Sequence, residues 1–96
     1  MKIIWSKKAI QDFENNIEFL NTEWNQSVVQ DFTLEIQRVF KIIELNPKSF
    51  KFDKNNNCYV VTITKQISLF YRIKRDQIIL FRFWNNYQNP NQMNIS

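Results

Sequence analysis

The side chains best able to carry chemistry in this sequence are three cations and a phenol in its second half. They are Lys65, Arg72, Arg82 and Tyr87. Cleavage of RNA through its own 2′-hydroxyl needs a group that accepts the hydroxyl proton, a cation that stabilises the phosphorane and a donor for the leaving oxygen. Histidine, the usual proton carrier, does not occur. These four residues are therefore the candidate catalytic set, although their spacing does not require them to converge.

Each member of this set also has a structural interpretation. Arg72 and Arg82 lie inside apolar segments, where an unpaired cation is costly, so they must face solvent, pair with acids or meet a partner. Tyr87 could act as a phenol or stack on a base, but anchoring the C-terminal segment is the favoured role. Lys65 falls in a turn and could simply be solvated.

The sequence offers no metal cluster and no thiol chemistry, because it has no histidine and a single cysteine. We expect no cofactor. Cys58 cannot form an internal disulfide, which suits a reducing cytosol, and we expect it to be a half-buried strand residue. Residues 1–5 turn polar too soon for a signal peptide, and no apolar run approaches the ~18 residues of a membrane span. These features predict a cytoplasmic protein that does not attach to membranes.

Charge is unevenly distributed along the chain. Residues 1–46 hold five basic and seven acidic side chains, a net of −2, whereas residues 47–96 hold eight basic and two acidic, a net of +6. Phosphate backbones and acidic protein segments are natural partners of the second half. The candidate residues for contact with such a partner are Phe70, Lys74, Trp84, Lys51 and Lys54.

The spacing of apolar residues predicts a short strand at residues 2–5 followed by a helix that Ser6 caps. Asn25-Gln26 interrupts the helical pattern. The buried stripe of this helix would consist of Ala9, Phe13, Ile17, Leu20 and Trp24, with Trp5 also in the core.

A second amphipathic helix follows at once. Ser27 and Gln30 have the spacing of a capping box, which is expected to open this helix, and Asn46-Pro47 ends it. Its buried face would consist of Val29, Phe32, Ile36, Val39, Phe40 and Ile43. Residues 48–57 then form a polar connector, and three strands are expected at residues 58–64, 67–74 and 77–84.

The sequence contains no glycine, so asparagine or aspartate must occupy positions of positive φ. We expect such turns at Asn55-Asn56-Asn57 and at Asn85-Asn86. The chain from Asn85 onward is rich in asparagine and glutamine and should be loosely held, above all from about residue 88, unless Tyr87, Pro90 or Met93 pins it.

These elements predict one α+β domain over residues 1–96 in the order β-α-α-β-β-β. The helical hairpin would pack on one face of a twisted antiparallel sheet, with strand 2–5 at an edge. The other face would carry some of Phe70, Arg72, Lys74, Arg82 and Trp84. The hairpin register, which the sequence leaves open, decides which of them share that face.

Short strings in this order are similar to the toxins of the RelE/ParE superfamily, from bacterial type II toxin–antitoxin pairs. The strings are Trp5-Ser6-Lys7-Lys8-Ala9 with Asp12, Trp24-Asn25, Asn46-Pro47, Leu69-Phe70-Tyr71-Arg72-Ile73 and Gln88-Asn89-Pro90. The resemblance spans essentially the whole chain and leans towards the ParE-like subgroup. It implies the same fold and a cognate antitoxin as partner.

Two positions depart from the family pattern. The terminal motif, usually Asp-Xaa-Arg-Gln-Asn-Pro, here has Asn85 for the aspartate and Tyr87 for the arginine. The RelE-like ribonucleases also have an arginine just before the Leu-Phe-Tyr strand core, where this chain has Ser68. Both guanidinium positions are therefore empty, which disfavours nuclease activity.

Three classes of function follow. The first is a toxin that binds DNA gyrase or another essential target, with ribosome-dependent cleavage of mRNA as the alternative activity. The second is a catalytically decayed module that only binds its antitoxin. The third is a plain RNA-binding protein, which ranks last because the paired-aromatic strand signature is missing.

Overall fold

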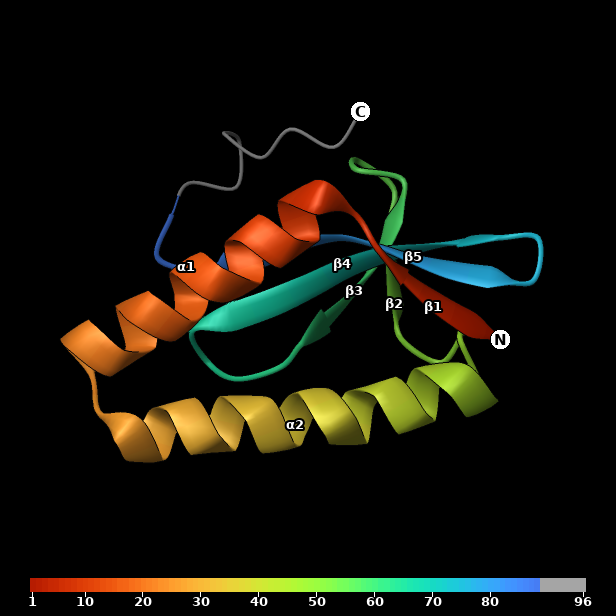
Figure 1. The fold of residues 1–96 in the computed structure, drawn as a ribbon. Coiled ribbons are helices and arrows are strands. Elements are labelled where there is room, and N and C mark those ends of the chain that lie inside the picture. Colours follow the sequence, from red (N-terminus) through yellow and green to blue (C-terminus); the bar gives the residue numbers. More distant parts are fainter. Residues whose placement is uncertain (89–96) are drawn as a thin grey trace.

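The computed structural model describes residues 1–88 as two helices packed against a five-stranded sheet (Figure 1). In chain order the elements are β1 (Lys2–Trp5), α1 (Lys7–Glu23), α2 (Gln26–Leu45), β2 (Lys51–Asp53), β3 (Cys58–Thr62), β4 (Ile67–Lys74) and β5 (Gln77–Asn85). The predicted α+β class and the order of strand, helical hairpin and antiparallel meander are confirmed. Most of the segment that was expected to be loose, including Pro90 and Met93, lies outside the described residues.

Polar side chains determine where the two helices begin. The Ser6 hydroxyl accepts a hydrogen bond from the Ala9 N–H at 3.0 Å, as predicted. The second helix begins at Gln26, because the side chain of Asn25 accepts from the Val28 N–H at 3.1 Å. The prediction that Ser27 caps this helix was therefore wrong. Asparagine caps as well as serine does, and Asn25 comes first along the chain.

The strand order is β1-β5-β4-β3-β2. β1 lies at one edge, as expected, and pairs in parallel with the start of β5, whereas the other neighbours are antiparallel. β2 forms the opposite edge and was missed, because residues 48–57 read as a polar connector. It is only three residues long and pairs with β3 across a tight turn. β3 is also shorter than predicted and ends at Thr62.

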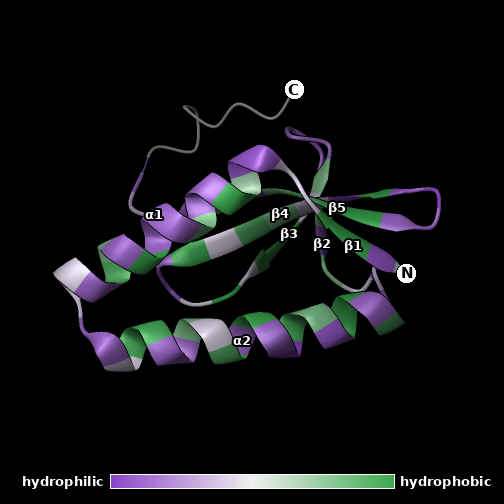
Figure 2. Cartoon of the chain, viewed as in Figure 1, coloured by the Kyte–Doolittle hydropathy of each residue, from purple (hydrophilic) through white to green (hydrophobic). Residues whose placement is uncertain are grey.

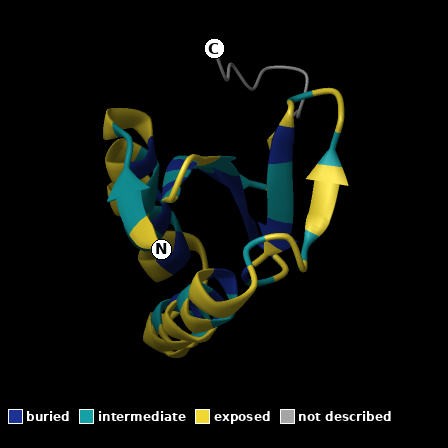
Figure 3. Ribbon diagram, turned by 90° about the vertical axis from the view of Figure 1, so that its right-hand side faces the viewer, coloured by how far each residue is buried: buried dark blue, intermediate teal, exposed yellow. Residues whose placement is uncertain are grey.

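The main core lies between the helices and one face of the sheet. Figure 2 shows apolar residues along both helices and the longer strands, and Figure 3 shows that burial is concentrated in the central strands and in parts of the helices. Trp5 packs against this core, as predicted. Trp24 does not: α1 ends at Glu23, and the indole remains 41% exposed. Neither helix of the described chain is long and apolar enough to cross a membrane.

A bulge in the β4–β5 hairpin sets the register that the sequence left open. Tyr71 pairs with Leu80 whereas Phe70 pairs with Arg82, so Phe81 is the extra residue of β5. On the sheet face away from the main core, Phe70 forms a second small cluster with Trp84 and Cys58. Cys58 is fully buried there, so the expectation of half-burial was wrong.

Two residues among the described ones have positive φ, Asn57 at 53° and Arg75 at 59°. Asn57 ends the β2–β3 turn, as the absence of glycine predicted. The corresponding expectation for Asn85 and Asn86 was wrong. An arginine occupies the second position instead, as the first residue of the two-residue turn between β4 and β5.

Candidate functional site

Arg82 is held by a carboxylate rather than left free for chemistry. Its Nε and Nη2 donate to the two oxygens of Asp12 at 2.6 and 3.0 Å, and both side chains are largely buried. The guanidinium also lies over the Trp84 ring, 5.3 Å from its centroid. This arrangement neutralises the cation and engages two of its three nitrogens with a carboxylate.

Helix α1 completes the edge of β5 where β1 ends. Beyond Leu80, no strand within residues 1–88 lies beside the edge of β5 that faces away from β4. Asp12 accepts a hydrogen bond from the Phe83 N–H at 3.1 Å, and the buried Asn16 amide donates to the Phe83 carbonyl at 2.8 Å. Two side chains one helical turn apart therefore satisfy backbone groups that would otherwise be unpaired.

Arg72 stabilises the turn between β2 and β3 by hydrogen bonds to its backbone. Its Nε donates to the Asn57 carbonyl at 2.8 Å and its Nη2 to the Asn56 carbonyl at 3.1 Å. The guanidinium stacks on Phe81 at 4.4 Å from the ring centroid. Like Arg82, this residue has a structural role that accounts for a cation inside an apolar strand.

Four residues gather at the other end of the sheet, where β5 leaves it. We call this group, Phe19, Trp24, Lys65 and Tyr87, the Tyr87 corner. The Tyr87 ring stacks on Trp24 with centroids 6.5 Å apart and meets Phe19 at 6.3 Å. The Lys65 Nζ lies over Trp24 at 5.9 Å. Tyr87 remains 59% exposed, so the corner presents ring faces and one cation to solvent.

Asn86 positions the turn that carries Lys65. Its N–H donates to the Gln66 carbonyl at 2.6 Å, and its side chain donates to the Lys65 carbonyl at 3.2 Å. The Ser68 hydroxyl donates to Asn86 Oδ1 at 2.9 Å. The chain at residues 85–88 thus makes specific contacts, and Tyr87 is one of the residues that the sequence named as able to pin this segment.

A pocket of about 270 Å³ lies between α1 and the end of β5. Its lining includes Phe19, which also belongs to the Tyr87 corner, and Trp84. The Trp84 Nε1 is buried and has no hydrogen-bond partner within residues 1–88. This pocket extends the corner along the helix.

The residues proposed for partner contact fall into two groups. Phe70 and Trp84 are buried, with 7% and 6% exposed, and offer a partner little surface. Lys51, Lys54 and Lys74 are exposed on the strand and turn regions of the basic half. A partner that binds the basic half would therefore contact these lysines rather than the two buried aromatic residues.

Two weak acids, the Tyr71 phenol and the Cys58 thiol, are kept protonated by burial. Burial raises the pKa of the Tyr71 phenol, whose O–H donates to the Pro47 carbonyl at 2.6 Å. Burial also raises the pKa of the Cys58 thiol, and Arg72 opposes this only in part. Neither group is poised to act as a nucleophile or base near neutral pH.

The four candidate catalytic residues are therefore not brought together. Lys65 and Tyr87 meet at Trp24, Arg82 is paired with Asp12, and Arg72 lies at the far end of β4. The Tyr87 corner can stack on and attract a partner, but none of its four residues is a carboxylate or a histidine that could act as a general base. No group of metal-ligating side chains occurs among these residues either.

Sequence reasoning missed the surface roles of Phe19 and Trp24 and the edge-capping roles of Asp12 and Asn16. A signal for the last two was present. They are spaced by four residues, and Asn16 interrupts the apolar face of an amphipathic helix. A polar side chain in such a position needs a buried partner.

Comparisons with known proteins agree with this fold. A family model described as "ParE toxin of type II toxin-antitoxin system, parDE" matches residues 3–90. A solved structure titled "Chromosomal ParDE TA system from P. aeruginosa" is similar with a TM-score of 0.67 and 18% sequence identity, over 88% of this chain and 95% of that one. At this identity the likeness concerns the fold. No curated protein sequence matches the chain.

Proposed function

Since the chain belongs to the family of ParE toxins of type II toxin–antitoxin systems, we propose that it inhibits bacterial growth by binding an essential protein, DNA gyrase first among the candidates. A cognate antitoxin would hold it inactive. The observation that carries the choice of binding over cleavage is the separation of the candidate catalytic residues. Two of the three candidate cations are committed to structural contacts with Asp12 and with the β2–β3 turn.

The Tyr87 corner is the surface that we assign to the target. Trp24 and Tyr87 are exposed, and their rings are held by contacts with each other and with the half-buried Phe19, so little side-chain entropy is lost when a partner packs against them. Exposed tyrosine and tryptophan are also the residues that most often dominate binding energies at protein interfaces. Lys65 adds a positive charge that favours an acidic target surface.

The antitoxin would bind the basic half of the toxin. The exposed Lys51, Lys54 and Lys74 attract an acidic segment, which could fold from a disordered state as it binds. Such a segment would also cover the partly exposed apolar residues of this region, including Phe52.

Cleavage of mRNA on the ribosome remains the second candidate, because Lys65 and Tyr87 lie on the same exposed corner. A cation and a phenol beside a stacked base could assist cleavage if the ribosome supplied the missing groups. A decayed module that only binds its antitoxin is the third.

Controlled induction of the chain in bacteria separates the three. Gyrase inhibition predicts growth arrest, induction of the DNA-damage response and loss of supercoiling by purified gyrase. A ribosomal nuclease predicts arrest with fragmented translated messages and an unchanged DNA-damage response. Normal growth, with soluble folded protein in the same cells, would contradict both toxin mechanisms. Relief of arrest by the product of a neighbouring gene would identify the antitoxin.

A further inference from the structure

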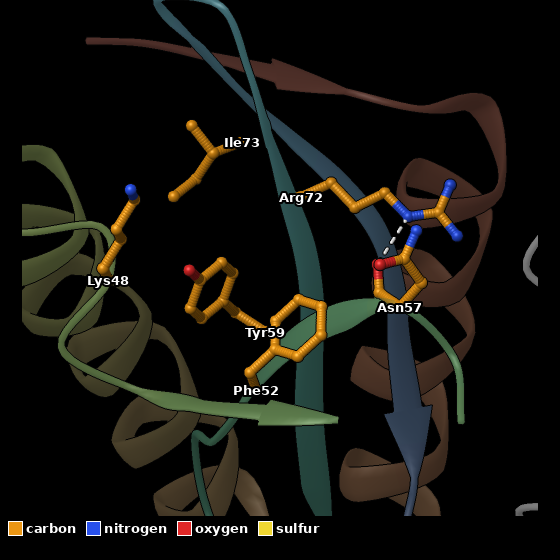
Figure 4. A pocket seen from close by; sticks show the side chains of 6 residues that line it. All are labelled: Lys48, Phe52, Asn57, Tyr59, Arg72 and Ile73. Atoms are coloured by element: carbon orange, nitrogen blue, oxygen red, sulfur yellow. Dashed lines mark hydrogen bonds between the residues drawn. The ribbon is translucent and has the colours of Figure 1, made fainter. Parts of the chain in front are cut away.

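A second pocket lies at the opposite end of β4 from the Tyr87 corner. It has a volume of about 330 Å³ and is lined by Lys48, Phe52, Asn57, Tyr59, Arg72 and Ile73 (Figure 4). We call it the Lys48 pocket. Its volume is at the small end of the range for ligand sites, about 300–1,000 Å³. A site of this size suits one or two side chains rather than a whole helix.

The walls of the Lys48 pocket are fixed before anything binds. Tyr59 stacks on the buried Tyr71 with centroids 5.4 Å apart, and Phe52 meets Tyr59 edge-on at 5.1 Å. The Tyr71 O–H donates to the carbonyl of Pro47, the residue before Lys48. The same aromatic stack therefore holds both the floor of the pocket and the loop that carries its cation, which lowers the entropic cost of binding.

The Lys48 pocket carries positive charge that no acidic residue of its lining neutralises. None of its six lining residues is acidic. Arg72 is engaged by the carbonyls of the β2–β3 turn, but the Lys48 Nζ and the Tyr59 hydroxyl make no hydrogen bond or ion pair within residues 1–88. Figure 4 shows both groups, together with Ile73, directed at the same space, while Arg72 extends away towards Asn57.

We infer that the Lys48 pocket binds an acidic side chain and an adjacent apolar side chain of the antitoxin. The carboxylate would accept a hydrogen bond from Tyr59 and pair with Lys48, and the apolar group would pack against Ile73 and Phe52. The identity of the partner rests on the proposed function, whereas the chemistry of the ligand does not.

A protein carboxylate fits the pocket better than a nucleic-acid backbone does. Phosphate backbones are bound by several free cations along a groove. The Lys48 pocket has one free cation and two aromatic walls. The distance from the Tyr87 corner, at the other end of β4, also separates this site from the surface assigned to the target.

The ligand chemistry can be tested on the full chain with N-acetyl-L-phenylalanine as the probe and its amide as the uncharged control. Chemical-shift changes in NMR spectra should centre on Lys48, Tyr59 and Ile73 and saturate for the acid, with about tenfold weaker binding of the amide. Lys48→Gln and Tyr59→Phe should each weaken binding of the acid. The matched control Lys54→Gln, which removes the same charge outside the pocket, should not. Equal binding of acid and amide, or a preference for inorganic phosphate or a dinucleotide, would overturn the inference.

The partner is tested separately with the antitoxin that relieves growth arrest. Lys48→Gln and Tyr59→Phe should raise the Kd of the toxin–antitoxin complex by about three- to tenfold, and neither change should reduce the arrest caused by the toxin alone. Unchanged Kd with intact arrest and rescue would refute the pocket and leave the proposed function standing. Failure of the arrest itself would refute the proposed function, while the probe titration would still decide the chemistry of the pocket.

Discussion

Asp12 of α1 occupies, at the backbone of Phe83, the hydrogen-bonding place that β1 would occupy if it continued past Trp5. The carboxylate accepts the Phe83 N–H and at the same time holds the Arg82 guanidinium. A single side chain thereby joins the first helix to the last strand across 71 positions of sequence. Arg82, which the sequence offered as a candidate for catalysis, is one half of an ion pair that stabilises the fold.

Replacement of Asp12 should therefore unfold the protein more readily than replacement of an exposed acid on the same helix. Asp12→Ala leaves a largely buried guanidinium and a backbone N–H unpaired, and we expect it to lower the free energy of unfolding by about 3 kcal/mol. Urea denaturation measures the loss, and Glu14→Ala is the matched control. Combining Asp12→Ala with Arg82→Met should recover part of the stability. Equal stabilities of Asp12→Ala and Glu14→Ala would contradict this role.

The order of elements could be predicted because it depends on local periodicity. Apolar residues at helical spacing and alternating strand residues determine α1, α2 and the meander, which the structure confirms. The features that were missed depend on what lies across space. β2 is three residues long and exists only because β3 offers it a partner. The bulge at Phe81 and the positive φ of Arg75 likewise belong to the pairing of two strands and not to either strand alone.

The sequence singled out several residues of the candidate site, but it did not predict what those residues do in the fold. The sequence indicated that Arg72 and Arg82 needed partners, but the partners, two turn carbonyls and Asp12, lie far away along the chain. Tyr87 stacks on Trp24 just after β5 ends. The surface that these two residues share was not predicted, because Trp24 continues the apolar stripe of its helix.

The left-handed conformation of Asn57 gives a second test of stability. A β-branched residue is strained at a φ of 53°, so Asn57→Val should lower the free energy of unfolding by about 1–2 kcal/mol. Asn57→Gly, which adopts this conformation freely, should change it by less than about 1 kcal/mol. The comparison uses thermal or urea unfolding with Asn55→Val, in the same turn but without positive φ, as the control. Similar losses in the two valine variants would contradict strain at Asn57.

Introducing at position 68 the arginine that the resemblance assigns to RelE-like ribonucleases should not create a nuclease. Ser68 is 7% exposed and donates to Asn86. Ser68→Arg would bring an unpaired cation beside the buried Trp84 cluster and should lower the free energy of unfolding by about 2–3 kcal/mol. Ser68→Ala should cost only about 1 kcal/mol, the lost hydrogen bond. Ribosome-dependent cleavage of mRNA by a stable Ser68→Arg variant would be the contrary result.

Alkaline pH should destabilise the protein through Tyr71. The unfolded phenol ionises near its ordinary pKa of 10.0, while burial raises the pKa of Tyr71 in the folded state. Above pH 10, unfolding therefore releases a proton from this phenol. The free energy of unfolding should then fall by up to about 1.4 kcal/mol per pH unit. Stability below pH 10 is unaffected by this group.

Urea denaturation between pH 9 and pH 11 measures this fall. Tyr71→Phe should flatten it while it lowers stability at neutral pH through loss of the bond to Pro47. Both proteins should carry Cys58→Ala, because burial also raises the pKa of that thiol and adds a slope of the same sign. Parallel pH profiles with and without the phenol would rule out Tyr71 as the cause.

Tyr87 distinguishes target binding from catalysis. If the ring packs against the target, Tyr87→Phe should leave growth arrest unchanged, whereas Tyr87→Ala should weaken binding by at least about tenfold. If the hydroxyl takes part in RNA cleavage, Tyr87→Phe should abolish arrest. Survival of induced cells and the Kd for purified gyrase distinguish target binding from RNA cleavage. Because Tyr87 is exposed, we expect both variants to fold.

The pairing of β1 with β5 has a consequence for synthesis. Ser6, directly after β1, donates hydrogen bonds to the carbonyls of Leu80 and Phe81. Among the described residues, the four residues of β1 pair only with residues 77–80 of β5. During synthesis the residues of the helical hairpin therefore leave the ribosome before most of the sheet that the hairpin covers. The toxin fold closes only when its last strand arrives, so an interrupted translation leaves a fragment without the Tyr87 corner.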